Sequence, residues 1–180
     1  HVDRSIDFPL EFLYDNCIGT ANLLEYLRLY HRDHLETVLY FSTDEVFGPA
    51  PDGVFYKEWD RYNSGNPYSA SKAAAEEVCL AYHNTYGLPI LISHCMNVFG
   101  KRQHPEKFFP LIINKLLNSE TISIHADAKK ERSGSRFYIH TDDVAEAVLF
   151  LLKLHSEHKI NSGDKFNITG SEEITNLELA

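Results

Sequence analysis

A short apolar run ends in polar residues in the stretch Thr37-Val-Leu-Tyr-Phe-Ser-Thr-Asp-Glu45. Continuous β-rich apolar runs of this length are typical of strands buried on both faces of a sheet. Asn66-Pro67 then indicates a helix start, because a capping side chain followed by proline favours one. We expect this helix to reach Tyr86 and Leu88-Pro-Ile-Leu-Ile-Ser93 to be the next buried strand. A strand, a helix and a strand within about 55 residues predict a parallel crossover unit.

The rest of the chain keeps alternating between helical and extended patterns. Helices are expected at 9–31, 108–117 and 141–154, and short strands at 121–125, 137–139 and 166–168. Alternation of this kind is typical of an α/β protein with a mostly parallel sheet. We therefore predict an α/β fold of the doubly wound, Rossmann-like type.

Composition limits the class of protein. The chain has 180 residues, 43% of them apolar, and a formal net charge of −9, which argues against nonspecific nucleic-acid binding. No apolar stretch approaches the roughly 20 residues of a membrane helix, and the N-terminus has no signal-peptide pattern. Cys17, Cys79 and Cys95 form no CxxC pair, so we expect reduced thiols and a cytoplasmic location.

Tyr68 and Lys72 are four residues apart on the expected helix 67–86 and so share one face of it. A tyrosine phenol loses its proton near pH 10, and a nearby ammonium lowers that pKa, which would make the phenol a usable base. The bare spacing is also compatible with a chance surface pair. Small residues flank the pair in Asn66-Pro-Tyr-Ser-Ala-Ser-Lys-Ala-Ala-Ala-Glu76 and leave room for a flat ligand.

Asp44 and Glu45 follow the first strand directly, and Asn97 follows the next one. In open α/β sheets ligands bind beyond the carboxyl ends of the strands, so these side chains lie where catalytic groups are expected. Two neighbouring carboxyl groups can act as acid and base if their environments differ. The alternative is a pair of solvated loop acids.

Histidine pairs give a weaker signal. His31 and His34, and likewise His155 and His158, have a spacing compatible with metal ligands. Each pair falls near the expected end of a helix, where solvated histidines are favoured by the helix dipole, and no third ligand is indicated. We expect no metal site.

Four strings together resemble a known family: Ser42-Thr-Asp-Glu-Val-Phe-Gly48, Asn66-Pro-Tyr-Ser-Ala-Ser-Lys72, Tyr86-Gly-Leu-Pro89 and Pro105-Glu-Lys107. They are similar to the extended short-chain dehydrogenase/reductase family, and most of all to its dTDP-glucose 4,6-dehydratase branch. The resemblance covers essentially the whole chain. Its most specific element is the triplet Thr43-Asp44-Glu45.

The resemblance implies a soluble NAD-dependent lyase of deoxysugar biosynthesis. Tyr68, as phenolate, would remove the 4-hydroxyl proton of a nucleotide-sugar while NAD⁺ takes hydride from C4, and Thr43 would hold the 4-oxygen. Glu45 would then remove the C5 proton and Asp44 would protonate the departing 6-hydroxyl. Hydride return to C6 would give the 4-keto-6-deoxy sugar.

The resemblance also implies binding roles. Cofactor-binding residues would be Tyr68, Lys72, Ser42 and Val98, and substrate-binding residues would be Thr43, Asn97, Lys107, Phe108 and Arg136. The family's second asparagine after this strand is Val98 here, and a tyrosine near the nucleotide is His125. Which nucleotide and sugar are bound stays open.

The resemblance divides the chain into a Rossmann part, at 1–100 and about 136–155, and part of a smaller substrate-binding lobe, at about 101–135 and 156–180. No GxxGxxG string occurs, and the chain does not begin with Met. We therefore expect an N-terminal pyrophosphate-binding segment to be missing, and these 180 residues alone to be inactive.

Two alternatives stay open. An epimerase or decarboxylase of the same family would share the Tyr68–Lys72 pair, although Asp44 argues against it because those reactions expel no 6-hydroxyl. A non-catalytic dimerising or binding module is the other. The helices 9–31 and 67–86 match those that pair across the family's homodimer, so a second copy of the chain is an expected partner.

Overall fold

The computed structural model describes residues 2–51, 53–129 and 131–180. It divides into two compact units. Unit 1 comprises residues 1–95 and 148–168, and unit 2 comprises residues 96–147 and 169–180. The assignment of a Rossmann part and a substrate-binding lobe stays a prediction, since compactness does not show which unit binds substrate.

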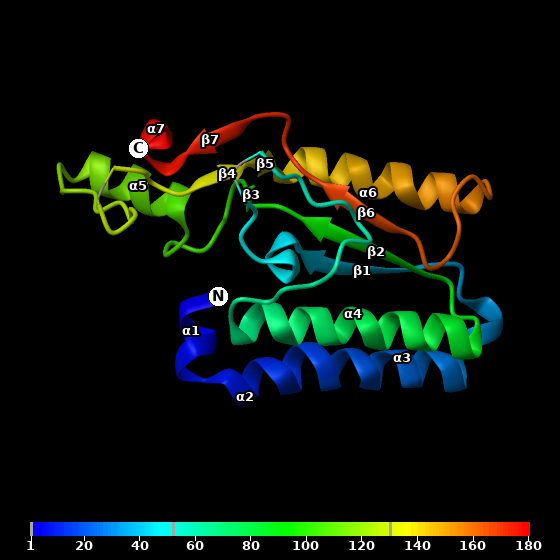
Figure 1. The fold of residues 1–180 in the computed structure, drawn as a ribbon. Helices are drawn as coiled ribbons and strands as arrows, with labels where there is room; N and C mark the ends of the chain where they lie inside the picture. The colour runs from blue at the N-terminus through cyan, green and yellow to red at the C-terminus, as the bar shows by residue number, and fades with distance from the viewer. Residues whose placement is uncertain (1, 52, 130) are drawn as a thin grey trace. The chain divides into compact units, whose positions relative to one another are not determined.

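The described chain begins with helices and then mixes strands and helices, with α4 between β1 and β2 (Figure 1). In chain order they are α1 (Val2–Asp7), α2 (Pro9–Phe12), the π-helical η1 (Leu13–Ile18), α3 (Gly19–Tyr30), the 3₁₀ turn η2 (Arg32–His34), β1 (Val38–Thr43), the 3₁₀ turn η3 (Asp44–Phe47), α4 (Pro67–Tyr86), β2 (Ile90–Cys95), β3 (Val98–Phe99), α5 (Phe108–Leu117), β4 (Ser135–Phe137), β5 (Ile139–His140), α6 (Thr141–Ser156), β6 (Lys165–Ile168), β7 (Glu173–Thr175) and α7 (Asn176–Leu179).

Unit 1 is built on a parallel sheet in the order β1-β2-β6. Helix α4 joins β1 to β2, so the predicted crossover unit is confirmed. The register pairs Val38 with Ile90 at the start and Thr43 with Cys95 at the end. The carboxyl ends of β1 and β2 are therefore level with each other, and the residues that follow β1 begin at that edge of the sheet.

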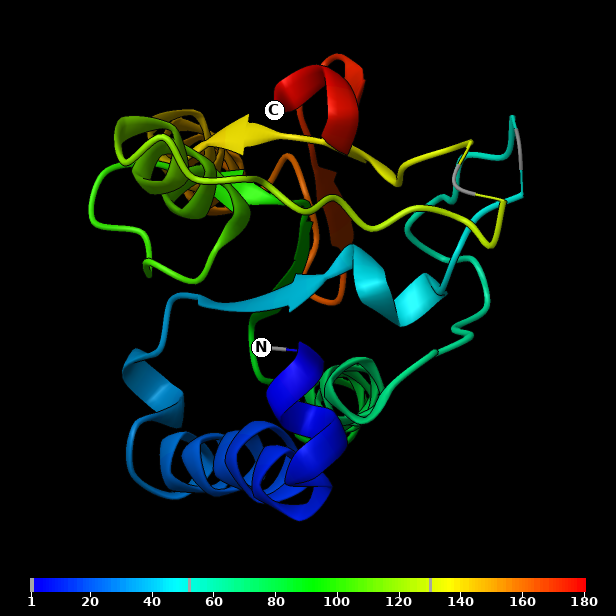
Figure 2. The same cartoon turned by 90° about the vertical axis from the view of Figure 1, so that its left-hand side faces the viewer.

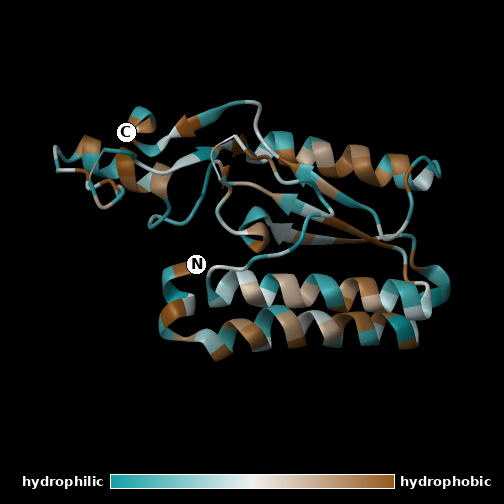
Figure 3. Cartoon of the chain, in the orientation of Figure 1, coloured by the Kyte–Doolittle hydropathy of each residue, from teal (hydrophilic) through white to brown (hydrophobic). Residues whose placement is uncertain are grey.

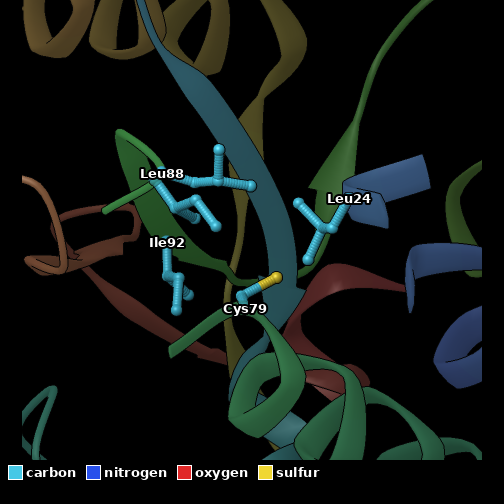
Figure 4. Close-up of a cluster of buried hydrophobic side chains, with 5 residues drawn as sticks. Leu24, Cys79, Leu88 and Ile92 are labelled. Carbon is cyan, nitrogen blue, oxygen red and sulfur yellow. The ribbon is translucent and has the colours of Figure 1, made fainter. Parts of the chain in front are cut away.

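Helices α3 and α4 lie side by side on one face of this sheet, and residues 148–156 of α6 lie on the other (Figures 1 and 2). Between the helices and the strands sits a core of fully buried side chains, shown in Figure 4: Leu24, Cys79, Leu88, Ile90 and Ile92. Burying a leucine or isoleucine side chain contributes about 1.5–3 kcal/mol, so this cluster anchors α4 against β2.

The ends of α4 follow from local sequence. Asn66 caps the helix by accepting a hydrogen bond from the Ser69 N–H at 2.9 Å, and the Ser69 hydroxyl accepts one from the Asn66 N–H at 3.2 Å. Pro67 occupies the first turn, where its missing N–H costs nothing. Gly87 ends the helix with φ of 70°, a conformation that glycine adopts without strain. The predicted helix 67–86 is confirmed.

The predicted helix 9–31 is helical but not uniform. It consists of α2, the π-helical turn η1 and α3, and it ends at Tyr30. Phe8 precedes it without a side-chain cap. A π turn adds a residue per turn, so it shifts the faces of α2 and α3 relative to each other.

Unit 2 contains two small sheets, a parallel β3–β5 pair and an antiparallel β4–β7 pair. Helix α5 has the predicted bounds, whereas the strand predicted at 121–125 is wrong. That stretch finds no partner strand among the described residues, and only an isolated bridge between Ala126 and Ser133 follows it. An extended sequence becomes a strand only when another strand pairs with it.

Across residues 2–51, 53–129 and 131–180, none of the helices combines the length and the apolar content needed to span a bilayer.

Candidate active site

The triplet Thr43-Asp44-Glu45 lies where β1 gives way to the turn η3. The Thr43 hydroxyl caps this turn by accepting a hydrogen bond from the Glu45 N–H at 3.3 Å, and it lies 3.2 Å from Asp44 Oδ1. Thr43 is buried, while Asp44 and Glu45 are half-buried. Both carboxyl groups therefore stand at the carboxyl edge of the parallel sheet, as predicted.

Tyr68 and Lys72 occupy the first turns of α4, and both side chains are half-buried. The Tyr68 N–H donates to the hydroxyl of Ser5, a fully buried residue of α1, at 3.1 Å. The Phe12 ring packs edge-on against Tyr68 with centroids 6.1 Å apart. These contacts fix the start of α4 against the N-terminal helices, and with it the position of the phenol.

The phenol of Tyr68 contacts the side chain of Thr43, the last residue of β1. Burial raises its pKa, a hydrogen bond with the Thr43 side chain opposes this, and the negative charges of Glu45 and Asp44 raise it further. The net shift is upward, so the predicted lowering of the Tyr68 pKa by Lys72 is wrong for this structure. Two carboxylates close to the phenol disfavour a third negative charge.

Lys72 is engaged elsewhere. Its ammonium donates to the backbone carbonyl of Phe41 at 2.6 Å and lies 4.3 Å from the centre of the Tyr40 ring. Burial lowers the pKa of Lys72, and the negative charge of Glu76 raises it in part. Lys72 thus ties α4 to β1 in this arrangement.

Unit 1 therefore brings together the five predicted catalytic residues Thr43, Asp44, Glu45, Tyr68 and Lys72 on β1, η3 and α4. Ser42 lies in the same unit, with its hydroxyl directed inward to the carboxylate of Glu76. A Ser42 contact with a cofactor would thus have to use its backbone.

The remaining predicted binding residues lie in unit 2. Asn97 has a positive φ of 34° and accepts a backbone bond from Ile139 at 3.5 Å, and Val98 begins β3. Lys107 precedes α5 and is exposed, and Phe108 begins that helix. Arg136 is exposed on β4, where its guanidinium donates to the Ser135 carbonyl at 2.8 Å.

Sequence reasoning missed Asn16 and Ser5. Asn16 lies in the π-helical turn η1 and donates to the Ser71 hydroxyl at 2.9 Å, inside the Tyr68–Lys72 turn. An asparagine in a helix interior is unfavourable, and π turns often mark functional positions, so this residue carried a readable signal. Ser5 carried none, because its contact with Tyr68 spans 63 residues.

By their spacing, the two histidine pairs are candidate metal ligands. Within the part of the chain that the structure describes, no cluster of three or more His, Cys, Asp or Glu side chains could hold a metal ion. His155 instead bridges Thr37 at 2.7 Å and Ser162 at 3.0 Å, which ties α6 to the start of β1.

Comparison with known proteins places the chain in a family. The model of the NAD dependent epimerase/dehydratase family matches residues 1–169, and the chain belongs to this family. It is 37% identical to a dTDP-glucose 4,6-dehydratase of Xanthomonas campestris pv. campestris, over 99% of the chain and 50% of the relative. It is 35% identical to the dTDP-D-glucose 4,6-dehydratase of Dictyostelium discoideum, over 100% of the chain and 41% of the relative.

Solved structures of the same family are similar to this chain. The chain resembles DesIV, a dTDP-glucose 4,6-dehydratase of Streptomyces venezuelae solved with NAD and TYD bound, with a TM-score of 0.87, 36% identity and coverage of 99% of this chain and 52% of that one. A UDP-glucose 4-epimerase of Thermus thermophilus in complex with NAD gives 0.86 at 27% identity, over 99% and 56%. These likenesses confirm the α/β fold prediction and the family resemblance. The chain spans about half the length of the relatives it matches.

Proposed function

We propose that the full-length protein is an NAD-dependent nucleotide-sugar 4,6-dehydratase, which converts dTDP-glucose or a close analogue to its 4-keto-6-deoxy form. The observation that carries this proposal is the meeting of Thr43, Asp44 and Glu45 with Tyr68 at one end of β1. The relatives named above add support. The cytoplasmic location stays a prediction.

The residues present fit the nicotinamide ribose of NAD. An ammonium has three donor protons, so Lys72 can keep its bond to Phe41 and also hold a ribose hydroxyl. Tyr68 lies one turn away on the same face of α4. NAD, when bound, would supply the hydride acceptor for C4 and later the donor for C6.

Tyr68 and Thr43 would act on the 4-hydroxyl. Thr43 would hold the sugar oxygen by its hydroxyl, and the Tyr68 phenolate would take the proton and become a phenol. Because the pKa of Tyr68 is raised by burial and by two carboxylates, the phenol needs added positive charge before it can act as a base. The ammonium of Lys72, one turn away on the same face of α4, would supply that charge through space while it keeps its bond to Phe41.

Asp44 and Glu45 would carry the elimination. The new ketone acidifies the C5 proton, which Glu45 removes, and Asp44 gives a proton to the 6-hydroxyl as it leaves as water. The two neighbours leave β1 at the start of η3, so their side chains can reach different atoms of one sugar. An epimerase acting at C4 needs neither step, and this is why the pair favours a dehydratase over the epimerases among the similar structures.

Solvent deuterium tests this proposal. The full-length protein converting dTDP-glucose in heavy water should place deuterium at C5 of the product, because reprotonation draws on a proton exchanged through Glu45. Glu45→Gln should slow elimination by roughly 10²–10⁴, while Glu36→Gln, an exposed glutamate just before β1, should change it little. A product with an inverted 4-hydroxyl and no deuterium at C5 would identify an epimerase.

We also propose that the protein is a homodimer through 9–31 and α4. Large apolar or aromatic side chains are exposed along α2, η1 and α3: Leu10, Leu13, Tyr14, Ile18 and Leu29. In Figure 3, residues coloured as hydrophobic recur along these helices. An unpartnered apolar surface of this kind marks an interaction site. Leu13→Glu with Ile18→Glu should reduce the sedimenting mass of the full-length protein from dimer to monomer, whereas Leu117→Glu on α5 should not. A monomeric wild type would contradict the proposal.

A further inference from the structure

A buried cluster of charged and polar side chains lies under the β1 end, and the reaction proposed above does not use it. At its centre is Glu76 of α4, whose side chain is fully buried. One carboxylate oxygen accepts from the Ser42 hydroxyl. The other accepts from the Tyr62 hydroxyl, from His94 Nε2 at 3.1 Å and from the Lys165 ammonium at 3.4 Å. Four elements of unit 1 thus converge on one carboxylate.

Both ring nitrogens of His94 have hydrogen-bond partners inside the cluster. Its Nε2 faces Glu76 and its Nδ1 lies 3.0 Å from Asn167 Oδ1. The Asn167 amide cannot turn round freely, because its Nδ2 donates to the Tyr56 carbonyl at 3.2 Å. Both ring nitrogens of His94 therefore face acceptors, and a doubly protonated ring satisfies both bonds.

Ionisable groups surround Glu76. His94 and the Lys165 ammonium face its carboxylate, and the Glu58 side chain accepts the backbone N–H of Asn167 at 3.2 Å. Burial by itself would raise the pKa of Glu76, but hydrogen bonding and charge from His94, with the hydroxyls of Ser42 and Tyr62, bring it below its usual value. A buried carboxylate in this setting stays ionised.

The cluster is joined to the active site through neighbouring residues. Ser42 immediately precedes Thr43, and Glu76 lies one turn beyond Lys72 and two turns beyond Tyr68 on α4. Strand β1 is therefore tied to α4 at consecutive residues, by the Phe41 carbonyl to Lys72 and by the Ser42 hydroxyl to Glu76. The position of Thr43 relative to the Tyr68 phenol depends on these ties.

We propose that Glu76 is a positioning residue for the Thr43–Tyr68 pair, and that the imidazolium of His94 together with Lys165 clamps its carboxylate in place. The inference rests on the proposed function, because it needs a reaction in which Thr43 and Tyr68 act on one oxygen. Without the charge of Glu76 the cations lose their acceptor, Ser42 loses its anchor, and the end of β1 is free to move against α4.

The test compares Glu76→Gln with Glu77→Gln in the full-length protein. Glu77 is its exposed neighbour on α4 and serves as the matched control. Because a misplacement of about 1 Å can cost 10²-fold in rate, Glu76→Gln should lower kcat roughly 10- to 100-fold while KM for the sugar nucleotide stays within about twofold. Glu77→Gln should leave both constants near the wild-type values. An unchanged kcat for folded Glu76→Gln would overturn the proposal, as would a rise in KM alone.

Two further measurements apply if Glu76→Gln does not fold. Ser42→Ala removes only the tie to β1, so it should also lower kcat without raising KM for NAD; an unchanged kcat would overturn the positioning role. In protein labelled with ¹⁵N-histidine at neutral pH, both His94 ring nitrogens should carry protons, with His94→Asn identifying the signals. A His94 ring with one bare nitrogen would overturn the clamp. This readout needs no catalysis, so an inactive wild type would count against the proposed function alone.

Discussion

The two units of this protein hold their predicted functional residues in different ways. In unit 1 the side chains proposed for catalysis stand at the end of a buried strand and on a long capped helix. Two of them have defined hydrogen-bond partners: Thr43 with the Glu45 N–H, and Lys72 with the Phe41 carbonyl. In unit 2, Lys107 and Arg136 are exposed on a helix start and a short edge strand. The proposed roles require this difference: groups proposed for catalysis need fixed positions before the ligand arrives, whereas groups proposed for binding need to be open to it.

The buried apolar residues follow the same division. Unit 1 has a continuous cluster around Leu24, Cys79 and Ile92, and it raises the pKa of the Cys79 thiol to about 12 through burial. Unit 2 buries single residues such as Ile112 and Ile139 beside two-stranded sheets. Rigid scaffolding is concentrated in the unit that carries the predicted catalytic residues.

The largest effect is expected from the phenol in unit 1. Tyr68→Phe in the full-length protein should reduce turnover by roughly 10²–10⁴, because acid–base transfer at the 4-oxygen is lost. No transient absorbance of reduced nicotinamide should appear in stopped-flow traces. Tyr86→Phe, at the last residue of the same helix, should leave turnover near the wild-type value.

The comparison variant for this experiment is Asp44→Asn. Only the acid for the leaving hydroxyl is lost there, so oxidation at C4 should still occur and the transient absorbance should persist while water loss slows. Equal loss of the transient in Tyr68→Phe and Asp44→Asn would show that the roles assigned to these neighbours are wrong.

A smaller effect of a different kind is expected in unit 2. If Arg136 binds the diphosphate, Arg136→Ala removes charge-assisted hydrogen bonds worth about 1.5–3 kcal/mol. KM for the sugar nucleotide should then rise roughly 10- to 100-fold with little change in kcat, in steady-state kinetics of the full-length protein. Lys101→Ala is the control. A fall in kcat at constant KM would mean that unit 2 shapes the reaction and not only the binding of substrate.

The crossover unit of β1, α4 and β2 was predictable because its signals are local. Asn66 and Pro67 specify the start of α4, and Gly87 specifies its end, whatever the rest of the chain does. The strand expected at 121–125 failed because pairing depends on a partner elsewhere, which an extended pattern does not reveal.

The site was predictable to a similar extent. The strand-end rule places Asp44 and Glu45 at the sheet edge, but it says nothing of the charge that surrounds Tyr68. The upward pKa shift of Tyr68 needs the folded distances to both carboxylates. The contacts of Glu76 with His94 and Lys165 join residues 18 and 89 positions apart, and they depend on the register of β1, β2 and β6.

One face of α4 carries Tyr68, Lys72, Glu76, Cys79 and His83. The first three contact the Thr43 hydroxyl, the Phe41 carbonyl and the buried polar cluster, in that order. Cys79 lies in the apolar core, and His83 Nδ1 lies 2.9 Å from the Leu88 carbonyl. The spacing of these residues along the helix therefore matters as much as their identity. One residue inserted between Tyr68 and His83 would rotate the two parts of α4 relative to each other by about 100°, so the proposed catalytic side chains and the core side chains would no longer share a face. The number of residues between Tyr68 and His83 therefore cannot change without breaking these contacts.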